Sequence, residues 1–269
     1  MENTKVLFIS QEITPYLPET EMSVIARNLP QGIQEKGREI RTFMPRFGNI
    51  NERRNQLHEV IRLSGMNLII DDSDHPLIIK VASIQSARMQ VYFIDNEDYF
   101  HRKSIIKDSK GNFHKDNDER MIFFARGVLE TVKKLRWSPD IVHCHGWFTS
   151  LVPLYVKKSY HDEPLFSDSK IIFSAYNVPF NEKLNDNFSK KVMFEGISKE
   201  DIKELNEPTF QNIAKIAFKY SDGVIKGSEE LPQDINSLTQ NLPVPVLDYQ
   251  SPEEYIDAYS VFYDKILTE

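Results

Sequence analysis

In the first 45 residues the apolar positions form a continuous run, then a helical repeat, and then a second run. Lys5–Ser10 is a compact apolar run, which is typical of a buried strand. Between Met22 and Ile33 the apolar residues recur at spacings of three, four and seven, which predicts an amphipathic helix that Gly37 ends. Another apolar run covers residues 39–44. The order strand, helix, strand predicts the β-α-β unit of a parallel sheet.

Short apolar runs follow in the middle of the chain, and they suit strands better than helices. A polar stretch after them, residues 103–114, predicts a mobile loop. The runs cover residues 57–63, 66–70, 77–84 and 89–94, and residues 71–74 predict a turn between the second and the third. We expect them to form a β-rich extension of the sheet.

Strands and helices alternate again in the second half. Asp116 begins a predicted helix and has the spacing of a capping box with Glu119. Strands are predicted at residues 140–145, 170–175 and 223–226, with helices that begin near Trp147 and Phe210. This alternation predicts an α/β fold with a Rossmann-like, doubly wound parallel sheet.

The last predicted helix has a strong start signal. Ser251 and Glu254 have capping-box spacing, and Pro252 takes the first helical position. Because a single helix of this length is marginal in water, we expect it to pack on the sheet. We therefore divide the chain into a sheet domain, residues 1–230, and a linker with a packed helix, residues 231–269.

Composition narrows the class of protein. The 269 residues are 40% hydrophobic and 27% charged, as in ordinary soluble domains, and the net charge is -7. An acidic chain lacks the field that attracts nucleic acid or anionic membranes, so we expect neither as a partner. No apolar stretch is long enough to cross a bilayer, and the single cysteine, Cys144, allows no internal disulfide. We expect a cytoplasmic protein.

Open α/β sheets bind ligands beyond the carboxyl ends of their strands. Three predicted strand ends carry polar or aromatic side chains, and these are our candidates for substrate binding: Glu12, Tyr16, His145, Trp147, Tyr176 and Asn177. The three aromatic rings among them could form a wall against the apolar face of a sugar. Packing of Trp147 at the start of its helix is the alternative.

His143 and His145 suggest a metal site, because alternation on a strand puts both on one face and Cys144 on the other. A structural zinc site needs four ligands, and no second cluster supplies them, so we expect no metal. We expect His143 to be a buried, hydrogen-bonded histidine and His145 to line a cleft. Phosphate-binding glycine motifs and a serine nucleophile elbow are absent from the sequence, and we expect no cofactor.

Several segments, in the same order, resemble the bacterial glycogen synthases and plant starch synthases. Residues 139–147 resemble that family's P-D-x-x-H-x-H-D-W, and residues 173–177 resemble its F-T-x-H-N. Further matches are residues 5–12, residues 44–48 (L-P-R-Y-G in the family), residues 91–95 with Asp116, Asn117 and Arg120, and residues 220–224. The resemblance covers residues 5–230 and implies the N-terminal half of a GT-B glycosyltransferase, whose active site lies between two Rossmann-like domains.

The chain departs from the family where the family binds a sugar nucleotide. In place of K-T-G-G-L-A-D it has Pro18 for the lysine, Thr20 and Glu21 for the glycines, and Val24 for the aspartate. The free amides at a helix start attract anions, but Glu19 and Glu21 would occupy that field and repel a diphosphate.

Three more family residues are replaced. The aspartate of H-D-W is Gly146, the histidine after that tryptophan is Phe148, and the histidine of F-T-x-H-N is Tyr176. Of the residues that this half contributes in the family, Glu12, His145, Trp147 and Asn177 remain. We assign none of them a catalytic role, and His145 is only a vestigial candidate for one.

Only residues 227–269 follow Lys226, so we expect the family's second, donor-binding domain to be absent and the last helix to correspond to the family's crossover helix. The resemblance implies a domain that is inactive alone and binds α-glucan, or binds a protein at the face left by the missing domain. One alternative is half of a glucosyltransferase, transferring glucose from ADP-glucose or UDP-glucose to α-1,4-glucan with a second chain. Another is a scaffold recruited for unrelated chemistry.

Overall fold

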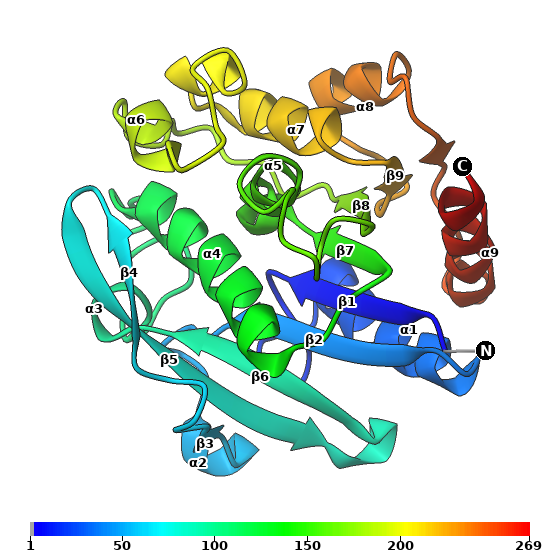
Figure 1. The fold of residues 1–269 in the computed structure, drawn as a ribbon, viewed down its shortest axis with the longest axis horizontal. Helices are drawn as coiled ribbons and strands as arrows, with labels where there is room; N and C mark the ends of the chain where they lie inside the picture. The colour runs from blue at the N-terminus through cyan, green and yellow to red at the C-terminus, as the bar shows by residue number, and fades with distance from the viewer. Residues whose placement is uncertain (1–2) are drawn as a thin grey trace.

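A computed structural model describes residues 3–269, which form one ten-stranded mixed sheet with helices on both faces (Figure 1). The strand order is β10-β9-β8-β7-β1-β2-β6-β5-β3, and β4 pairs with β5. Strands from β10 to β6 are parallel, whereas β3, β4 and β5 are antiparallel to their neighbours. The strands are β1 Lys5–Ser10, β2 Glu39–Pro45, β3 His58–Glu59, β4 Met66–Ile70, β5 Ser73–Ile84, β6 Met89–Asp95, β7 Ile141–His145, β8 Lys170–Ala175, β9 Gly223–Lys226 and β10 Val246–Leu247.

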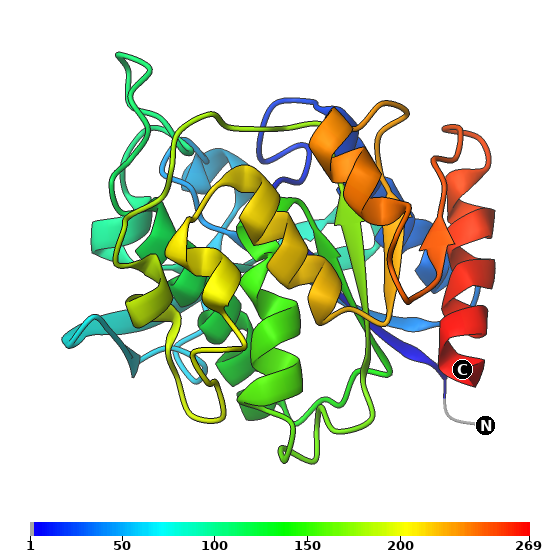
Figure 2. The same cartoon turned by 90° about the horizontal axis from the view of Figure 1, so that it is seen from above.

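Two helical layers cover this sheet (Figures 1 and 2). The helices α4, α5 and α7 pack on one face, and α1 packs with α9 on the other. The α-helices are α1 Glu21–Glu35, α2 Glu52–Asn55, α3 Glu97–Phe100, α4 Asn117–Leu135, α5 Leu151–Lys158, α6 Phe188–Val192, α7 Phe210–Lys219, α8 Gln233–Thr239 and α9 Tyr255–Thr268, and the 3₁₀ turns are η1 Gln85–Ala87, η2 Trp147–Thr149 and η3 Lys203–Asn206. None of the helices in residues 3–269 is both long enough and apolar enough to cross a membrane.

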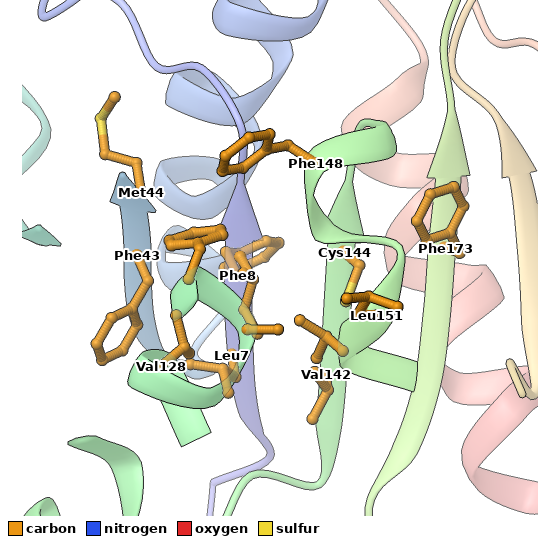
Figure 3. Close-up of a cluster of buried hydrophobic side chains, with 14 of the residues drawn as sticks. Leu7, Phe8, Phe43, Met44, Val128, Val142, Cys144, Phe148, Leu151 and Phe173 are labelled. Atoms are coloured by element: carbon orange, nitrogen blue, oxygen red, sulfur yellow. The ribbon is translucent and has the colours of Figure 1, made fainter. Parts of the chain in front are cut away.

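The core lies between the central strands and α4 and α5. Side chains of β1, β2 and β7 meet those of Val128 on α4 and Leu151 on α5 (Figure 3). Both β1 and β7 are buried over nearly their whole length. This is why they read as continuous apolar runs, since a parallel strand covered on both faces has no solvent side.

The predicted α/β class and the β-α-β opening are confirmed. One predicted strand is wrong, because residues 57–63 contain only the short β3, and residues 61 and 62 are exposed. The chain turns back there: the amide of Leu63 donates to the carbonyl of Val60 at 2.9 Å. The turn predicted at residues 71–74 is found at residues 71 and 72, between β4 and β5, and residues 73 and 74 already pair with β4.

Both predicted capping boxes in the second half are wrong. Asp116 is the N-cap residue of α4, but its carboxylate binds the guanidinium of Arg102 instead of a helix amide, with one contact at 2.9 Å. Ser251 is not the cap of α9, which begins at Tyr255. Its carbonyl accepts from the amides of Glu254 and Tyr255, both at 3.1 Å, so residues 252–254 form a turn that leads into the helix.

The last helix, α9, packs closely on α1 and on the sheet. A methyl group added at Gly32 of α1 would lie 2.5 Å from the side chain of Ile256, and one at Gly223 of β9 would lie 2.9 Å from that of Ile266. Arg38 donates to the carboxylate of Asp264 at 2.8 Å. A larger residue at position 32 or 223 would therefore require side chains of α9 to shift.

Candidate functional site

The strand order reverses direction around β1, which lies between β2 and β7, so the carboxyl ends of β1 and β7 form the topological switch point. Gln11 occupies this place. Its amide donates to the carbonyl of His145 at 3.1 Å, and its side-chain oxygen accepts from the amide of Phe148 at 3.2 Å. The side chain of Gln11 is buried. The amides of Gln11 and Phe148, which a ligand at this turn would otherwise bind, are therefore both hydrogen-bonded within the protein.

The start of α1 is closed by a capping box between Thr20 and Ser23. The amide of Ser23 donates to the hydroxyl of Thr20 at 3.0 Å, and the amide of Thr20 donates to the hydroxyl of Ser23 at 2.8 Å. This cap departs from the usual capping-box signature, because Ser23 takes the place of the Glu or Gln three residues after the Thr, and the sequence therefore did not reveal it. The Thr20 hydroxyl also donates to the carboxylate of Glu12 at 2.9 Å.

Carboxylates surround the same helix start. Glu21 lies in the first turn of α1, where a negative charge is favourable, and accepts a hydrogen bond from the hydroxyl of Ser228. Glu19 lies outside the helix and is exposed, so only one of the two glutamates is in the first turn. Burial raises the pKa of Glu12 above its usual value, and its hydrogen bonds with Thr20 and Gln11 oppose that shift.

Gly146 lies between β7 and η2 with a φ of 84°. A Cβ atom there would lie 2.6 Å from the sulfur of Met22 and 3.1 Å from the side-chain oxygen of Gln11. The family resemblance places an aspartate at this position. In this chain Met22 and Gln11 fill the space that its side chain would need.

We expect Gly146→Asp to lower the free energy of unfolding by about 2–4 kcal/mol, the sum of backbone strain and overpacking. Gly65→Asp is the matched control, because Gly65 has a similar φ of 87° but open space around it. Urea unfolding of both variants should therefore show a smaller loss for the control. In a Met22→Ala background the Gly146→Asp penalty should fall by about 1 kcal/mol or more; equal penalties in both backgrounds would contradict the clash.

Two histidines form a fully buried cluster behind the switch point. The rings of His143 and His145 have centroids 3.9 Å apart. His143 binds the hydroxyl of Tyr263 at 2.6 Å through Nδ1 and the hydroxyl of Ser174 at 2.8 Å through Nε2. His145 binds the hydroxyl of Tyr176 at 2.8 Å through Nδ1. Within residues 3–269 its Nε2 has no hydrogen-bond partner.

Both histidines are held neutral. Burial lowers the pKa of His145 to about 3, and burial together with the neighbouring His145 ring lowers the pKa of His143 well below its usual value. The prediction that His143 is a satisfied core histidine is confirmed. The prediction that His145 lines a cleft is wrong, because the Tyr176 ring covers it and leaves none of its surface exposed.

The predicted aromatic wall is also wrong, since its three rings are buried in different places. Trp147 packs against Phe180 with ring centroids 4.7 Å apart, and Tyr16 packs edge-on against Phe93 at 4.9 Å. Tyr176 lies over Gly227, where a Cβ atom would be 2.5 Å from its ring. The alternative for Trp147, packing at the start of its helix, is the one observed.

Of the six candidate side chains, Asn177 is exposed and Glu12 is half-buried. The amide of Asn177 donates to the hydroxyl of Ser228 at 3.1 Å, and Ser228 in turn binds Glu21. Ser228 thus joins the end of β8 to the start of α1. Sequence reasoning missed it, although a small polar residue just after a β-strand was a usable signal. We call Glu12, Thr20, Glu21, Asn177 and Ser228 the carboxyl-edge site.

The charges at this edge do not favour a phosphate. Lys226, at the end of β9, is ion-paired with Asp248 at 2.8 Å. The two share a hollow with Glu229 and Glu230. In the described part of the chain, no three His, Cys, Asp or Glu side chains are grouped so that they could hold a metal ion.

Sequence comparisons agree with the pattern of motifs. The model of the starch synthase catalytic domain family matches residues 5–242. The glycogen synthase of Chlorobium limicola is 40% identical over 177 residues, which cover 65% of this chain and 36% of that protein. The glycogen synthase of Chlorobaculum parvum is 34% identical over 242 residues, covering 87% and 48%. This chain spans less than half the length of these relatives.

The structure has a counterpart of the same kind. The catalytic domain of starch synthase IV from Arabidopsis thaliana, solved with ADP and acarbose, matches with a TM-score of 0.70 and 17% identity, over 91% of this chain and 52% of that one. This likeness shows the fold, that of a GT-B glycosyltransferase. Together with the match over residues 5–242, it means that the chain belongs to the family of the starch synthase catalytic domain.

Proposed function

We propose that this domain binds α-glucan, or a protein, without transferring glucose on its own. One observation carries the proposal: the place where a parallel sheet offers free amides to a phosphate is occupied by the protein's own Gln11, Met22 and Glu21. A sugar nucleotide would have to displace a buried amide and approach a carboxylate. With the amide of Ser23 taken by the Thr20 cap and Lys226 paired with Asp248, the diphosphate gains too little to offset its dehydration.

An α-glucan makes different demands. It is neutral, and its hydroxyl groups bind carboxylates and amides of the kind that Glu12 and Asn177 present. Both side chains reach the surface of the carboxyl-edge site. The glycogen synthases that the chain resembles carry the glucan in their name, which supports the same ligand class here.

The test is calorimetry of the chain with ADP, ADP-glucose and maltoheptaose. We expect heat of binding with maltoheptaose alone, and a several-fold weaker affinity in Asn177→Ala, because one or two hydrogen bonds of about 1 kcal/mol each are lost. Asn241→Ala, an exposed asparagine after α8, is the control and should bind normally. Binding of ADP-glucose, or transfer of its glucose by this chain, would refute the proposal.

A second candidate is half of a glucosyltransferase whose donor-binding half comes from another chain. Glu12 and Asn177 remain in place at the surface, as that reaction would need. The buried His145 and the filled switch point count against it. Mixing the chain with the separately produced donor half of a relative, and finding that glucose is then incorporated, would favour it.

A further inference from the structure

The hairpin of β4 and β5 has a connection that fixes which backbone groups face outward. Asp71 and Asp72 have φ angles of 48° and 62°, as in a two-residue hairpin turn. In such a turn the flanking residues, Ile70 and Ser73, are the pair that exchange hydrogen bonds. Because the direction of the backbone groups alternates along β4, the amide and carbonyl of Leu68 point toward β5. Those of the residues on either side of Leu68 point away from β5.

Asn67 and Ile69 are these outward residues. The carbonyl of Ile69 confirms the direction, because it accepts from Nη1 of Arg126, which lies outside the hairpin, at 2.6 Å. Opposite Asn67 stands Pro76, which has no amide to donate across the pair. Within residues 3–269, β4 pairs only with β5, and no hydrogen bond reaches the amides of Asn67 and Ile69 or the carbonyl of Asn67.

A groove runs beside this free edge, between β4 and the segment that starts with α6. We call it the β4 groove; it encloses about 430 Å³ and is lined by Asn67, Ile69, Asp71, Asp72, Arg126, Lys190, Lys191, Met193 and Phe194. Figure 1 shows β4 at the margin of the sheet, with α6 next to the hairpin. Ile69 and Met193 are among the large apolar side chains that the protein exposes, at 60% and 40%. Natural proteins usually protect such edges with charge or proline.

Among residues 3–269, two cations without carboxylate partners line the groove, Arg126 from α4 and Lys190 from α6. Arg126 is about nine-tenths buried, stacks on the ring of Phe194 at 4.0 Å, and has an Nε atom without a hydrogen-bond partner in the described chain. Lys190 is exposed and makes no ion pair within residues 3–269. Lys191 differs, because Asp118 and Glu119 neutralise it at 3.0 Å and 2.5 Å.

We propose that the β4 groove binds an extended peptide segment of a partner protein as an added strand. Its backbone would pair with the free groups of Asn67 and Ile69, and one side-chain row would cover Ile69. The other row would be acidic and face Lys190 and Arg126. A strand is the occupant that supplies a donor and an acceptor at the required spacing, and the α6 segment across the groove leaves a slot beside β4.

The first measurement is amide hydrogen exchange of the chain alone, followed by NMR. The amides of Asn67 and Ile69 should exchange quickly, and those of Leu68 and Ile70, which pair with β5, slowly. A fluorescein-labelled octapeptide of alternating valine and glutamate is then added. We expect the amides of Asn67 and Ile69 to become protected from exchange when the peptide is present. The fluorescence anisotropy of the peptide should rise as the chain is added, and its affinity should be at least about tenfold higher than that of a valine–lysine peptide.

Asn67→Pro is the decisive variant. It removes an outward amide, leaves the pairing with β5 intact because that amide is not used there, and places proline on an edge strand, where it is tolerated. We expect about tenfold weaker binding of the valine–glutamate peptide with an unchanged melting temperature. Val261→Lys, at an exposed apolar position of α9, should bind within about twofold of the parent, as one exposed charge remote from a site has little effect.

Four outcomes would overturn the proposal. One is protection of the amides of Asn67 and Ile69 in the free monomer. A second is that the valine–glutamate peptide does not bind, and a third is that Asn67→Pro leaves its binding unchanged. The fourth is a concentration-dependent dimer, seen by analytical ultracentrifugation and abolished by Asn67→Pro. That result would mean that a second copy of the chain covers the edge.

Discussion

Between pH 7 and pH 4.5 the domain is expected to lose about 5 kcal/mol of its free energy of unfolding through His143 and His145. Both rings are fully buried and neutral in the folded state, where burial lowers the pKa of His145 to about 3 and that of His143 well below its usual value. In the unfolded chain each takes up a proton near pH 6.5.

The sign follows from this difference. Above about pH 6.5 neither state binds these protons, so the full stability is present. Below it the unfolded state binds two protons that the folded state excludes, and each histidine lowers the free energy of unfolding by about 1.4 kcal/mol per pH unit. The loss continues as the pH falls toward the folded-state pKa values.

Urea unfolding at several pH values between 4.5 and 8 measures this slope. In His145→Gln about half of the slope should disappear, although the variant is less stable at pH 7 because the bond to Tyr176 is weakened. His161→Gln is the matched control, since His161 is exposed, and should retain the full slope. A slope as steep in His145→Gln as in the parent would show that other groups cause the acid sensitivity.

Arg120→Leu is expected to lower the free energy of unfolding by about 4 kcal/mol, because it leaves buried carbonyls without donors. The guanidinium is fully buried and donates to the carbonyl of Tyr99 at 2.8 Å and to that of Ile105 at 2.6 Å. It also donates to the side chain of Asn117 at 2.7 Å. The variant therefore loosens the loop of residues 101–116 from α4.

Thermal and urea unfolding measure this loss, with Arg53→Leu as the control. Arg53 is exposed on α2, and its replacement should change the free energy of unfolding by less than about 0.5 kcal/mol. Arg120→Lys should fall between the two, because a single ammonium nitrogen keeps the charge but cannot place donors where both Nε and Nη1 of the guanidinium lie. Equal stability of Arg120→Leu and Arg53→Leu would contradict the anchoring role.

Local patterns predicted most elements of this fold. The runs at β1 and β7 marked buried strands, and the stripe from Met22 to Ile33 marked α1, because periodicity depends only on which faces are covered. The capping boxes at Asp116 and Ser251 failed for the opposite reason. The carboxylate of Asp116 binds Arg102, a partner that spacing along the chain does not reveal, and α9 begins four residues after Ser251.

For the candidate site, strand ends indicated the correct edge of the sheet but not which side chains reach its surface. Glu12 and Asn177 do, whereas His145 and Trp147 are buried. The sequence placed all of them just after strands, and it could not show that Tyr176 covers His145 or that Phe180 packs on Trp147. Exposure depends on residues that are distant in the chain.

By itself, the sequence determined the α/β class, the family, and the loss of a cation and two glycines at the start of α1. These follow from residue identity and local period. The tertiary structure alone decided that Gln11 and Met22 fill the switch point, that two neutral histidines lie behind it, and that β4 has a free edge. Each of these depends on contacts between segments far apart in the chain, whose geometry is set only when the core packs.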